Sequence, residues 1–146
     1  MHAFRAAVEA RDLDAIADLL ADDVRFTSPV AFTPYDGKPI TAAILRGVLR
    51  VFEDFHYVRE IVDAGGRDSA LVFEATVDGK VVNGCDFIRT DGDGKIVDLM
   101  VMVRPLQGAH ALSAAMGEQF GRIQAEAIAE LEARQRIDES TPPRLT

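Results

Sequence analysis

Residues 69–90 read SALVFEATVDGKVVNGCDFIRT, and their pattern predicts a β-hairpin. The dipeptide Asp78-Gly79 is a strong signal for a two-residue turn between two strands. A turn at this point places Phe73 opposite Gly84 and Leu71 opposite Asp86. Because side chains alternate between the two faces of a strand, one face of the hairpin collects an almost entirely apolar set: Leu71, Phe73, Ala75, Val77, Val82, Gly84, Asp86 and Ile88.

A second turn at Asp91–Gly94 returns the chain, and alternate residues of the following strand join the same face: Val97, Leu99, Val101 and Val103. Asp86 is then the single carboxylate on this face. An ionised carboxylate there would lose its hydration, so we expect Asp86 to be protonated, paired or directed into a cavity. One interpretation is a general acid/base, or a donor to a ligand oxygen. The alternative is a buried Asp that a neighbour satisfies: Arg89, Arg104, His56 or a loop amide.

The spacing of apolar residues changes from helical to strand-like near the middle of the chain. Helical spacing covers residues 3–21, 39–52 and 108–136, and Asp12 is expected to cap a helix that restarts after a break near Arg11. Strands are expected at 24–27, 56–63, 69–77, 81–90 and 95–104. This order predicts an α+β fold, with a cone-shaped, curved antiparallel sheet wrapped around N-terminal helices and an additional C-terminal helix. We expect one domain over residues 1–136 and a disordered tail over residues 137–146.

The last predicted strand, residues 95–104, is apolar on both faces, whereas an antiparallel strand normally exposes one face to water. A second cover is therefore needed. One candidate is the helical segment 108–136, and the other is a second copy of the protein that packs sheet to sheet. We expect a homodimer through the sheet, because exposed Met100 and Met102 beside Phe87 would form a patch that monomers avoid.

Composition excludes several classes of function. The chain has 146 residues, a net charge of −8 and a pI near 4.8, which disfavours nucleic acid and anionic membranes as partners. Cys85 is the only cysteine, so an internal disulfide and a thiolate zinc site are excluded. No apolar run is long enough for a membrane span or a signal-peptide core, and we expect a cytoplasmic protein.

Motifs for metals and cofactors are also missing from the sequence. The three histidines are scattered, and no glycine-rich loop is followed by the helix that a phosphate or dinucleotide site requires. The Asp91–Gly94 run lies within a hairpin and lacks the twelfth-position Glu of a calcium loop. We therefore expect neither a metal nor a cofactor.

The order of the predicted elements, together with several short runs, resembles the nuclear transport factor 2-like superfamily, in its SnoaL-like and ketosteroid isomerase-like branch. The resemblance covers roughly residues 3–107 and is carried by these runs: Arg11-Asp12-Leu13-Asp14-Ala15-Ile16, Leu20–Phe26, Ser28-Pro29, Asp36-Gly37, Asp86-Phe87-Ile88-Arg89 and Gly94-Lys95-Ile96. It implies a cone fold with a pocket for a small molecule.

The same resemblance tests individual activities. The similar steroid isomerases use a tyrosine on the first helix, a protonated Asp on the sheet and a basic Asp just before a Pro. The sheet Asp corresponds to Asp86, but the base position is Ser28 and the tyrosine position is Phe4, so steroid isomerisation by that mechanism is not expected. Epoxide-hydrolysing relatives carry an Asp where this chain has Val101. SnoaL-like cyclases act on substrates that are already acidic, for which one carboxylate with a polar partner suffices.

These considerations predict a pocket with two catalytic candidates, Asp86 and His56. His56 depends on the strand register, because a slip of one residue would turn Tyr57 toward the pocket instead. Gly84 is expected to leave space for a ligand. The predicted lining is Phe4, Val8, Ser28, Tyr35, Phe73, Gly84, Leu99, Val101 and Val103.

Three functions are compatible with this sequence, two with a pocket and one without. The first is a cofactor-free acid/base enzyme, an isomerase, cyclase or lyase, that acts on a small apolar molecule bearing a carbonyl group. The second is a non-catalytic protein that binds a hydrophobic ligand in the same pocket. The third is a dimeric interaction module with a filled core and no cavity.

Overall fold

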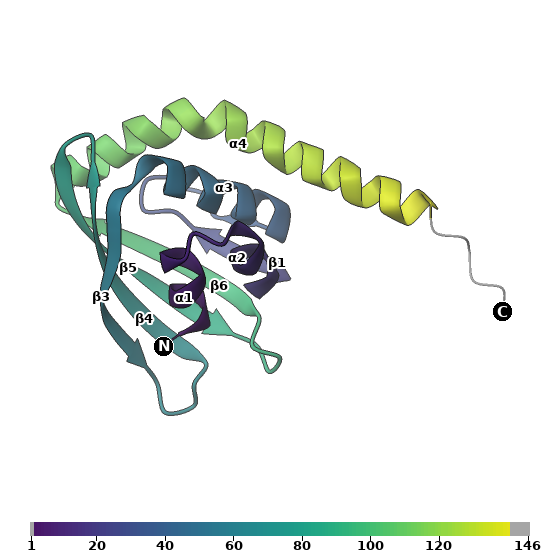
Figure 1. Ribbon diagram of the computed structural model, residues 1–146, viewed down its shortest axis with the longest axis horizontal. Helices are drawn as coiled ribbons and strands as arrows, with labels where there is room; N and C mark the ends of the chain where they lie inside the picture. Colours follow the sequence, from purple (N-terminus) through teal and green to yellow (C-terminus); the bar gives the residue numbers. More distant parts are fainter. Residues whose placement is uncertain (1, 141–146) are drawn as a thin grey trace.

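The computed structural model describes residues 2–140 and has the α+β architecture expected from the sequence (Figure 1). Helices cover one face of a curved sheet, and a long C-terminal helix runs along the helical side of the molecule. In chain order the elements are α1 (Ala3–Glu9), α2 (Leu13–Leu19), β1 (Leu20–Thr27), β2 (Tyr35–Asp36), α3 (Lys38–Val51), β3 (Glu53–Val62), β4 (Asp68–Val77), β5 (Lys80–Thr90), β6 (Ile96–Arg104) and α4 (Leu106–Ser140).

The N-terminal helical region is broken into two helices, as the Arg11–Asp12 signal predicts. Arg11 has a φ of 53°, which ends α1, and the Asp12 carboxylate accepts a hydrogen bond from the amide of Ala15 at the start of α2. The second helix ends earlier than expected, because β1 already begins at Leu20. The chain thus enters the sheet directly from α2.

All six strands form one sheet in the order β2-β1-β6-β5-β4-β3. Neighbouring strands are antiparallel except β1 and β6, which run parallel. The predicted hairpin register is confirmed, since Leu71 pairs with Asp86 and Phe73 pairs with Gly84. The turn at Asp78-Gly79 has the positive φ angles of 48° and 75° that its residues favour. Asp86 is therefore directed to the side that the helices cover.

A β-bulge near the second turn corrects one detail of the inner face. The register shifts between Arg89 and Thr90, so Thr90 pairs with Ile96. Ile96 is buried in the core, whereas Val97, which strict alternation predicts to face inward, is only half-buried. The extra residue at the bulge changes which side chains of β6 point to the core before Leu99.

The C-terminal helix packs on α3 and leaves the outer face of the sheet uncovered by the described residues (Figure 1). Phe87 and Met102 on that outer face are 38% and 52% exposed. Of the two candidate covers, the segment 108–136 is therefore excluded for this face. A second copy of the chain stays a prediction.

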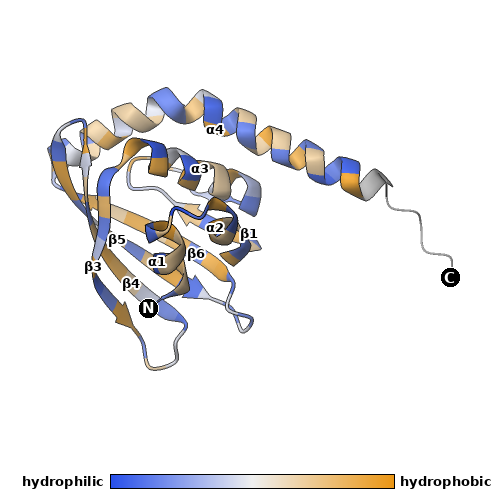
Figure 2. Ribbon diagram, viewed as in Figure 1, coloured by the Kyte–Doolittle hydropathy of each residue, from blue (hydrophilic) through white to orange (hydrophobic). Residues whose placement is uncertain are grey.

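Beyond the contacts with α3, α4 projects past the body of the domain with alternating polar and apolar residues (Figure 2). It continues to Ser140, so residues 137–140, predicted as part of a disordered tail, are helical. The rest of that predicted tail, residues 141–146, lies outside the described residues. No helix in the described part of the chain is long and apolar enough to cross a membrane.

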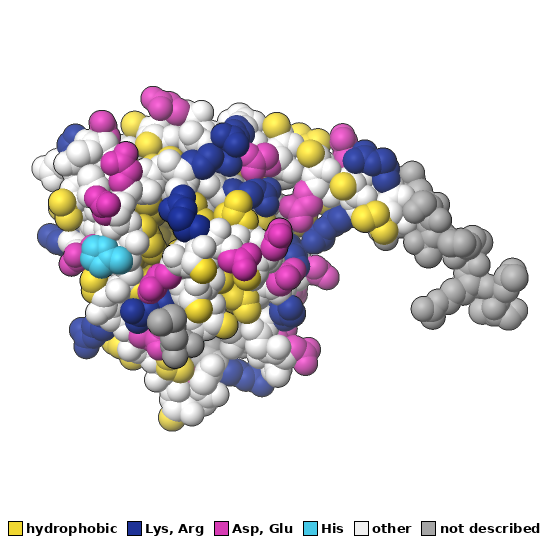
Figure 3. Space-filling view, viewed as in Figure 1, with side chains coloured by type: hydrophobic (Ala, Val, Ile, Leu, Met, Phe, Trp, Pro, Cys, Tyr) yellow, Lys and Arg dark blue, Asp and Glu magenta, His cyan; other side chains and the backbone are white. Residues whose placement is uncertain are grey.

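Charged side chains of both signs are interspersed over the helical side of the molecule, and apolar side chains show between them (Figure 3). This mixed surface, with a net charge of −8, lacks on this side the basic patch that nucleic-acid binding uses.

Candidate functional site

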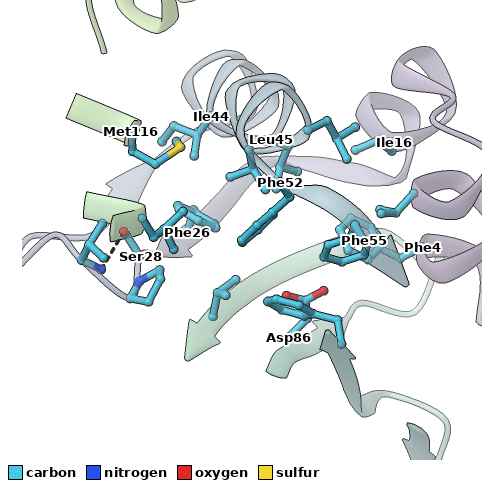
Figure 4. A pocket seen from close by; sticks show the side chains of 18 of the residues that line it. Phe4, Ile16, Phe26, Ser28, Ile44, Leu45, Phe52, Phe55, Asp86 and Met116 are labelled. Atoms are coloured by element: carbon cyan, nitrogen blue, oxygen red, sulfur yellow. Dashed lines mark hydrogen bonds between the residues drawn. The ribbon is translucent and has the colours of Figure 1, made fainter. Parts of the chain in front are cut away.

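An apolar pocket lies between the concave face of the sheet and the helices, and Asp86 forms part of its wall (Figure 4). Counted as the volume open to the centre of a water molecule, its free space is about 60 Å³. One water needs about 10–15 Å³ by this measure, so the pocket is narrow. Its walls come from α1, α3, β1, β3, β4, β5, β6 and α4 and from the loop after β1, as shown by Val8, Leu49, Phe26, Phe55, Phe73, Asp86, Val101, Met116 and Pro29.

Asp86 is paired with a phenol inside this pocket. The Tyr57 hydroxyl donates a hydrogen bond of 2.7 Å to Oδ2 of Asp86, and the carboxyl-bearing residue is only 6% exposed. No hydrogen bond from a described residue reaches Oδ1. One oxygen of the carboxyl group is thus held in place, and the other is available to a ligand.

The environment of Asp86 changes its acidity. Burial raises the pKa of Asp86 from its ordinary value of 3.8 to about 7, and the hydrogen bond from Tyr57 lowers it by a smaller amount. Burial, followed by the proximity of Asp86, raises the pKa of Tyr57 well above its usual range. Tyr57 therefore stays a donor at neutral pH, while Asp86 exchanges its proton close to neutrality.

The prediction that His56 is a second catalytic residue is wrong. His56 pairs with Glu74 on the outer side of the sheet, its side chain is 58% exposed, and its Nε2 lies 3.4 Å from the Glu74 carboxylate. The register shift between Tyr57 and Arg59 causes this outcome. It turns Tyr57 inward, so the alternative register supplies the partner of Asp86.

The arginines considered as partners of Asp86 lie elsewhere. Arg89 donates to Asp68 at 2.9 Å, and Arg104 donates to Asn83 at 3.0 Å, both at exposed positions. Consequently no cation among the described residues compensates the charge of Asp86. This is why burial dominates the shift of its pKa.

The structure sorts the predicted lining residues into two groups. Phe4, Val8, Ser28, Phe73 and Val101 line the pocket. The other predicted lining residues do not contact its free space, and each has a different location: Leu99 is fully buried in the core, Val103 packs against the core, Tyr35 lines a neighbouring groove, and Gly84 lies beneath an aromatic ring.

Gly84 provides space for Phe73 rather than for a ligand. A Cβ atom at Gly84 would lie 2.1 Å from Cζ of Phe73, so the ring occupies the space that the missing side chain leaves. The prediction of ligand space at Gly84 is therefore wrong. The glycine instead allows the outer end of the Phe73 ring to approach β5 closely at the Gly84 position.

Two aromatic residues that sequence reasoning missed, Phe52 and Phe55, complete this wall. Phe55 lies with its ring centroid 5.6 Å from Phe52, 4.8 Å from Phe73 and 5.0 Å from Tyr57. The i, i+2 spacing of Phe55 and Tyr57 was a signal that both share one face of a strand. Together these rings surround the hydroxyl–carboxyl pair with apolar surface.

The remaining polar group of interest is Ser28. Its Oγ accepts a hydrogen bond of 3.1 Å from the amide of Val30 and so stabilises the loop after β1. No group of three His, Cys, Asp or Glu side chains in residues 2–137 is arranged to hold a metal ion. The chemistry that the pocket offers is that of a single carboxyl group and its phenol partner.

Comparison with known proteins identifies the family of this architecture. The SnoaL-like domain family matches residues 1–99. A crystal structure of a steroid delta-isomerase from Pseudomonas aeruginosa is 43% identical, with a TM-score of 0.78, and the match covers 84% of this chain and 89% of that one. A bacterial protein with a cystatin-like fold from Silicibacter pomeroyi DSS-3 is 32% identical, with a TM-score of 0.79 and coverage of 86% and 93%.

A more distant match shows the fold alone. The structure of a putative polyketide cyclase from Pseudomonas putida KT2440 is 21% identical, with a TM-score of 0.60, and the match covers 73% of this chain and 89% of that one. The comparison with curated proteins gives no match.

Proposed function

This chain belongs to the SnoaL-like domain family, and on that premise we propose that it is a small-molecule enzyme that uses Asp86 for acid/base chemistry without a cofactor. Its substrate is an apolar molecule with a carbonyl or enol group. The reaction is an isomerisation, a cyclisation or an elimination that begins with transfer of a proton next to that carbonyl.

The observation that carries this proposal is the buried pair of Asp86 and Tyr57. A pKa of about 7 means that the protonated and ionised forms of Asp86 are both populated at neutral pH. A general acid/base works best when its pKa lies near the working pH. A buried carboxyl group without this role would be costly, since apolar side chains of the same size fill a core without any desolvation penalty.

The proposed reaction needs only the substrate and the carboxyl group of Asp86. Ionised Asp86 removes a proton from the carbon beside the carbonyl, and the electron pair of the broken C–H bond moves onto the carbonyl oxygen as an enolate. Protonated Asp86 then returns the proton to another carbon of the conjugated system, and the enolate collapses to a carbonyl. Tyr57 donates to Oδ2 and holds the carboxyl group so that Oδ1 carries the proton.

The reaction proposed here differs from the mechanism of the steroid isomerases. The Pseudomonas aeruginosa relative carries that name. In this chain the positions that correspond to the phenol donor and to the base are Phe4 and Ser28, and both line the pocket. Neither side chain can do what the isomerase residue does. We therefore propose a substrate whose proton is acidic enough for a single carboxyl group.

A second candidate function is binding without catalysis, because Phe4 and Ser28 supply no further acid or base beside Asp86. The Asp86→Asn substitution separates the two, since it keeps the shape and an acceptor for Tyr57 but cannot transfer a proton. The assay follows hydrogen–deuterium exchange of 2-tetralone, an apolar ketone with activated α-hydrogens, by NMR in D₂O. An Asp93→Asn variant, changed at an exposed turn, is the matched control.

The expected results differ clearly. An acid/base enzyme accelerates the exchange, and Asp86→Asn reduces the acceleration by about 100-fold or more, while Asp93→Asn does not. A binding protein gives no acceleration, and its affinity for 2-tetralone changes by less than about tenfold on Asp86→Asn, which is about 1.4 kcal/mol. Equal exchange by wild type and Asp86→Asn would exclude the proposed chemistry.

We also propose that two copies of this cytoplasmic protein pair through the outer faces of their sheets. The uncovered face carries Phe87, Met100 and Met102, and a hollow beside Phe87 and Met100 lies between β3 and β6. Arg89, with its ion pair to Asp68, lies at the edge of this apolar area, as polar residues do at the rim of an interface. The exposure of these side chains supports a dimer that would bury them and leave the Asp86 pocket free on the opposite side.

A further inference from the structure

A second hollow adjoins the Asp86 pocket at the end formed by Ser28 and Met116. It is an open groove of about 160 Å³, counted as the volume open to the centre of a water molecule, between α4, β2 and the loop after β1. Five residues form walls of both the pocket and the groove: Phe26, Ser28, Val30, Ile44 and Met116. In the close-up, Ser28 and Met116 lie at one end of the pocket, Phe4 and Ile16 lie at the opposite end, and Asp86 lies on the wall between them (Figure 4).

The groove has the chemistry of an apolar binding surface. Tyr35 connects Phe26 and Phe120, with ring centroids 6.4 Å from each, and these three rings line one side. None of the lining residues is charged, and hydroxyl groups are contributed by Ser28, Tyr35 and Ser113. A hydrocarbon chain or flat ring fits such a wall, whereas an ionic group would find no partner there.

Met116 lies between the two hollows. Its side chain is half-buried and packs against the core, and its Cε lies 3.6 Å from the position of a Cβ at Gly47. Methionine is unbranched and adapts its rotamers to irregular spaces. A change of rotamer at Met116 can therefore change the space between the two hollows without a movement of the backbone.

We propose that the pocket and the groove are two chambers of one site, and that the ligand is an elongated molecule with a carbonyl head and an apolar tail. The head reaches Asp86, and the tail passes Met116 and lies along Phe26, Tyr35 and Phe120. This proposal rests on the proposed function and adds the substrate class to it. It also explains how a pocket of only about 60 Å³ can serve a larger substrate, since part of that substrate lies outside it.

The test measures the affinity of a series of 2-alkanones, from 2-hexanone to 2-tetradecanone, by calorimetry with the full chain. Short ketones fill the pocket alone. For longer ones, each added methylene that enters the groove should tighten binding by up to about fourfold, which corresponds to about 0.8 kcal/mol. The measured quantity is the ratio of the affinities of a long and a short ketone.

Two glycines of α4 provide the decisive variant and its control. Gly117 lines the groove, and a Cβ atom added there meets nothing within 4 Å, so we expect Gly117→Phe to place a ring in the groove. Gly121 is equally open but does not line the groove. Both changes replace a helical glycine and so favour the helix. Gly117→Phe should reduce the long-to-short ratio at least tenfold, and Gly121→Phe should leave it unchanged.

The outcomes separate this proposal from the proposed function. Short ketones that bind with no gain on lengthening would overturn the second chamber and leave the Asp86 chemistry in place. Equal effects of Gly117→Phe and Gly121→Phe on the ratio would also overturn the second chamber. If no ketone of any length binds, the proposed function fails, and the two-chamber site fails with it.

Discussion

Replacing Asp86 by Asn should change how the stability of the fold depends on pH. Burial raises the pKa of Asp86 from 3.8 to about 7 in the folded protein, whereas in the unfolded chain the carboxyl group regains its ordinary value. Between these two values the folded state holds a proton that the unfolded state has released. The free energy of unfolding therefore falls as the pH rises through this window.

The size of the effect follows from the shift. Each pKa unit corresponds to about 1.4 kcal/mol of free energy. A rise from 3.8 to about 7 predicts that this one group makes the wild-type protein lose about 4 kcal/mol of unfolding free energy between pH 4 and pH 8. The contribution is fully present below pH 3.8 and is lost as the pH passes about 7. The Asp86→Asn variant has no titrating group at this position, and its amide oxygen still accepts a hydrogen bond from Tyr57.

The assay is urea denaturation of wild type and Asp86→Asn at each pH from 4 to 8. The difference between the two free energies of unfolding cancels the contributions of all other titrating groups. This difference should move by about 4 kcal/mol in favour of the variant from the acidic to the alkaline end. Asp93→Asn, at an exposed turn, serves as the control and should follow the wild type. A difference that stays constant over the whole range would refute a raised pKa at Asp86.

Three further changes test the site, the interface and the core. Tyr57→Phe removes the hydrogen bond that lowers the pKa of Asp86. The pH profile of ketone exchange should therefore move by about one unit to higher pH, and an unchanged profile would exclude Tyr57 as the partner. Met102→Arg places a charge on the outer face and should convert a dimer into monomers in sedimentation velocity, whereas a wild type that sediments as a monomer would contradict the proposed pairing. Gly84→Ala forces a methyl group onto the Phe73 ring and should destabilise the fold by about 1–3 kcal/mol in urea denaturation, and full stability would show that the ring is not held against β5.

Local signals in the sequence determined the central hairpin and the direction of Asp86. The Asp78-Gly79 turn fixes the register of β4 and β5, and strict alternation then directs Asp86 to the same face as Leu71 and Phe73. Turn chemistry and the period of two act over a few residues, so they can be recognised without knowledge of the rest of the fold. The order of the elements extends this local information to the α+β architecture.

The partner of Asp86 was decided by the tertiary structure. Tyr57 lies on β3, and its orientation depends on the register shift between Tyr57 and Arg59. A second shift lies between Glu53 and His56, where Asp54 has a φ of 51°. Irregularities of this kind add or remove a residue from the alternation, and the apolar pattern of a single strand does not reveal them. For this reason strict alternation predicts His56 in the position that Tyr57 occupies.

The shape of the site likewise depended on contacts between distant segments. The Phe73 ring fills the space over Gly84, and the packing of α4 on α3 brings Met116 to the end of the pocket and Phe120 to the neighbouring groove. Residue types and periodicity predict which side chains are buried. The free space that remains is the small difference between the volume that the fold encloses and the volume that its closely packed atoms fill. The sequence by itself therefore determines that a lone carboxyl group faces an apolar interior, and only the folded chain decides which hydroxyl holds it and where a ligand has room.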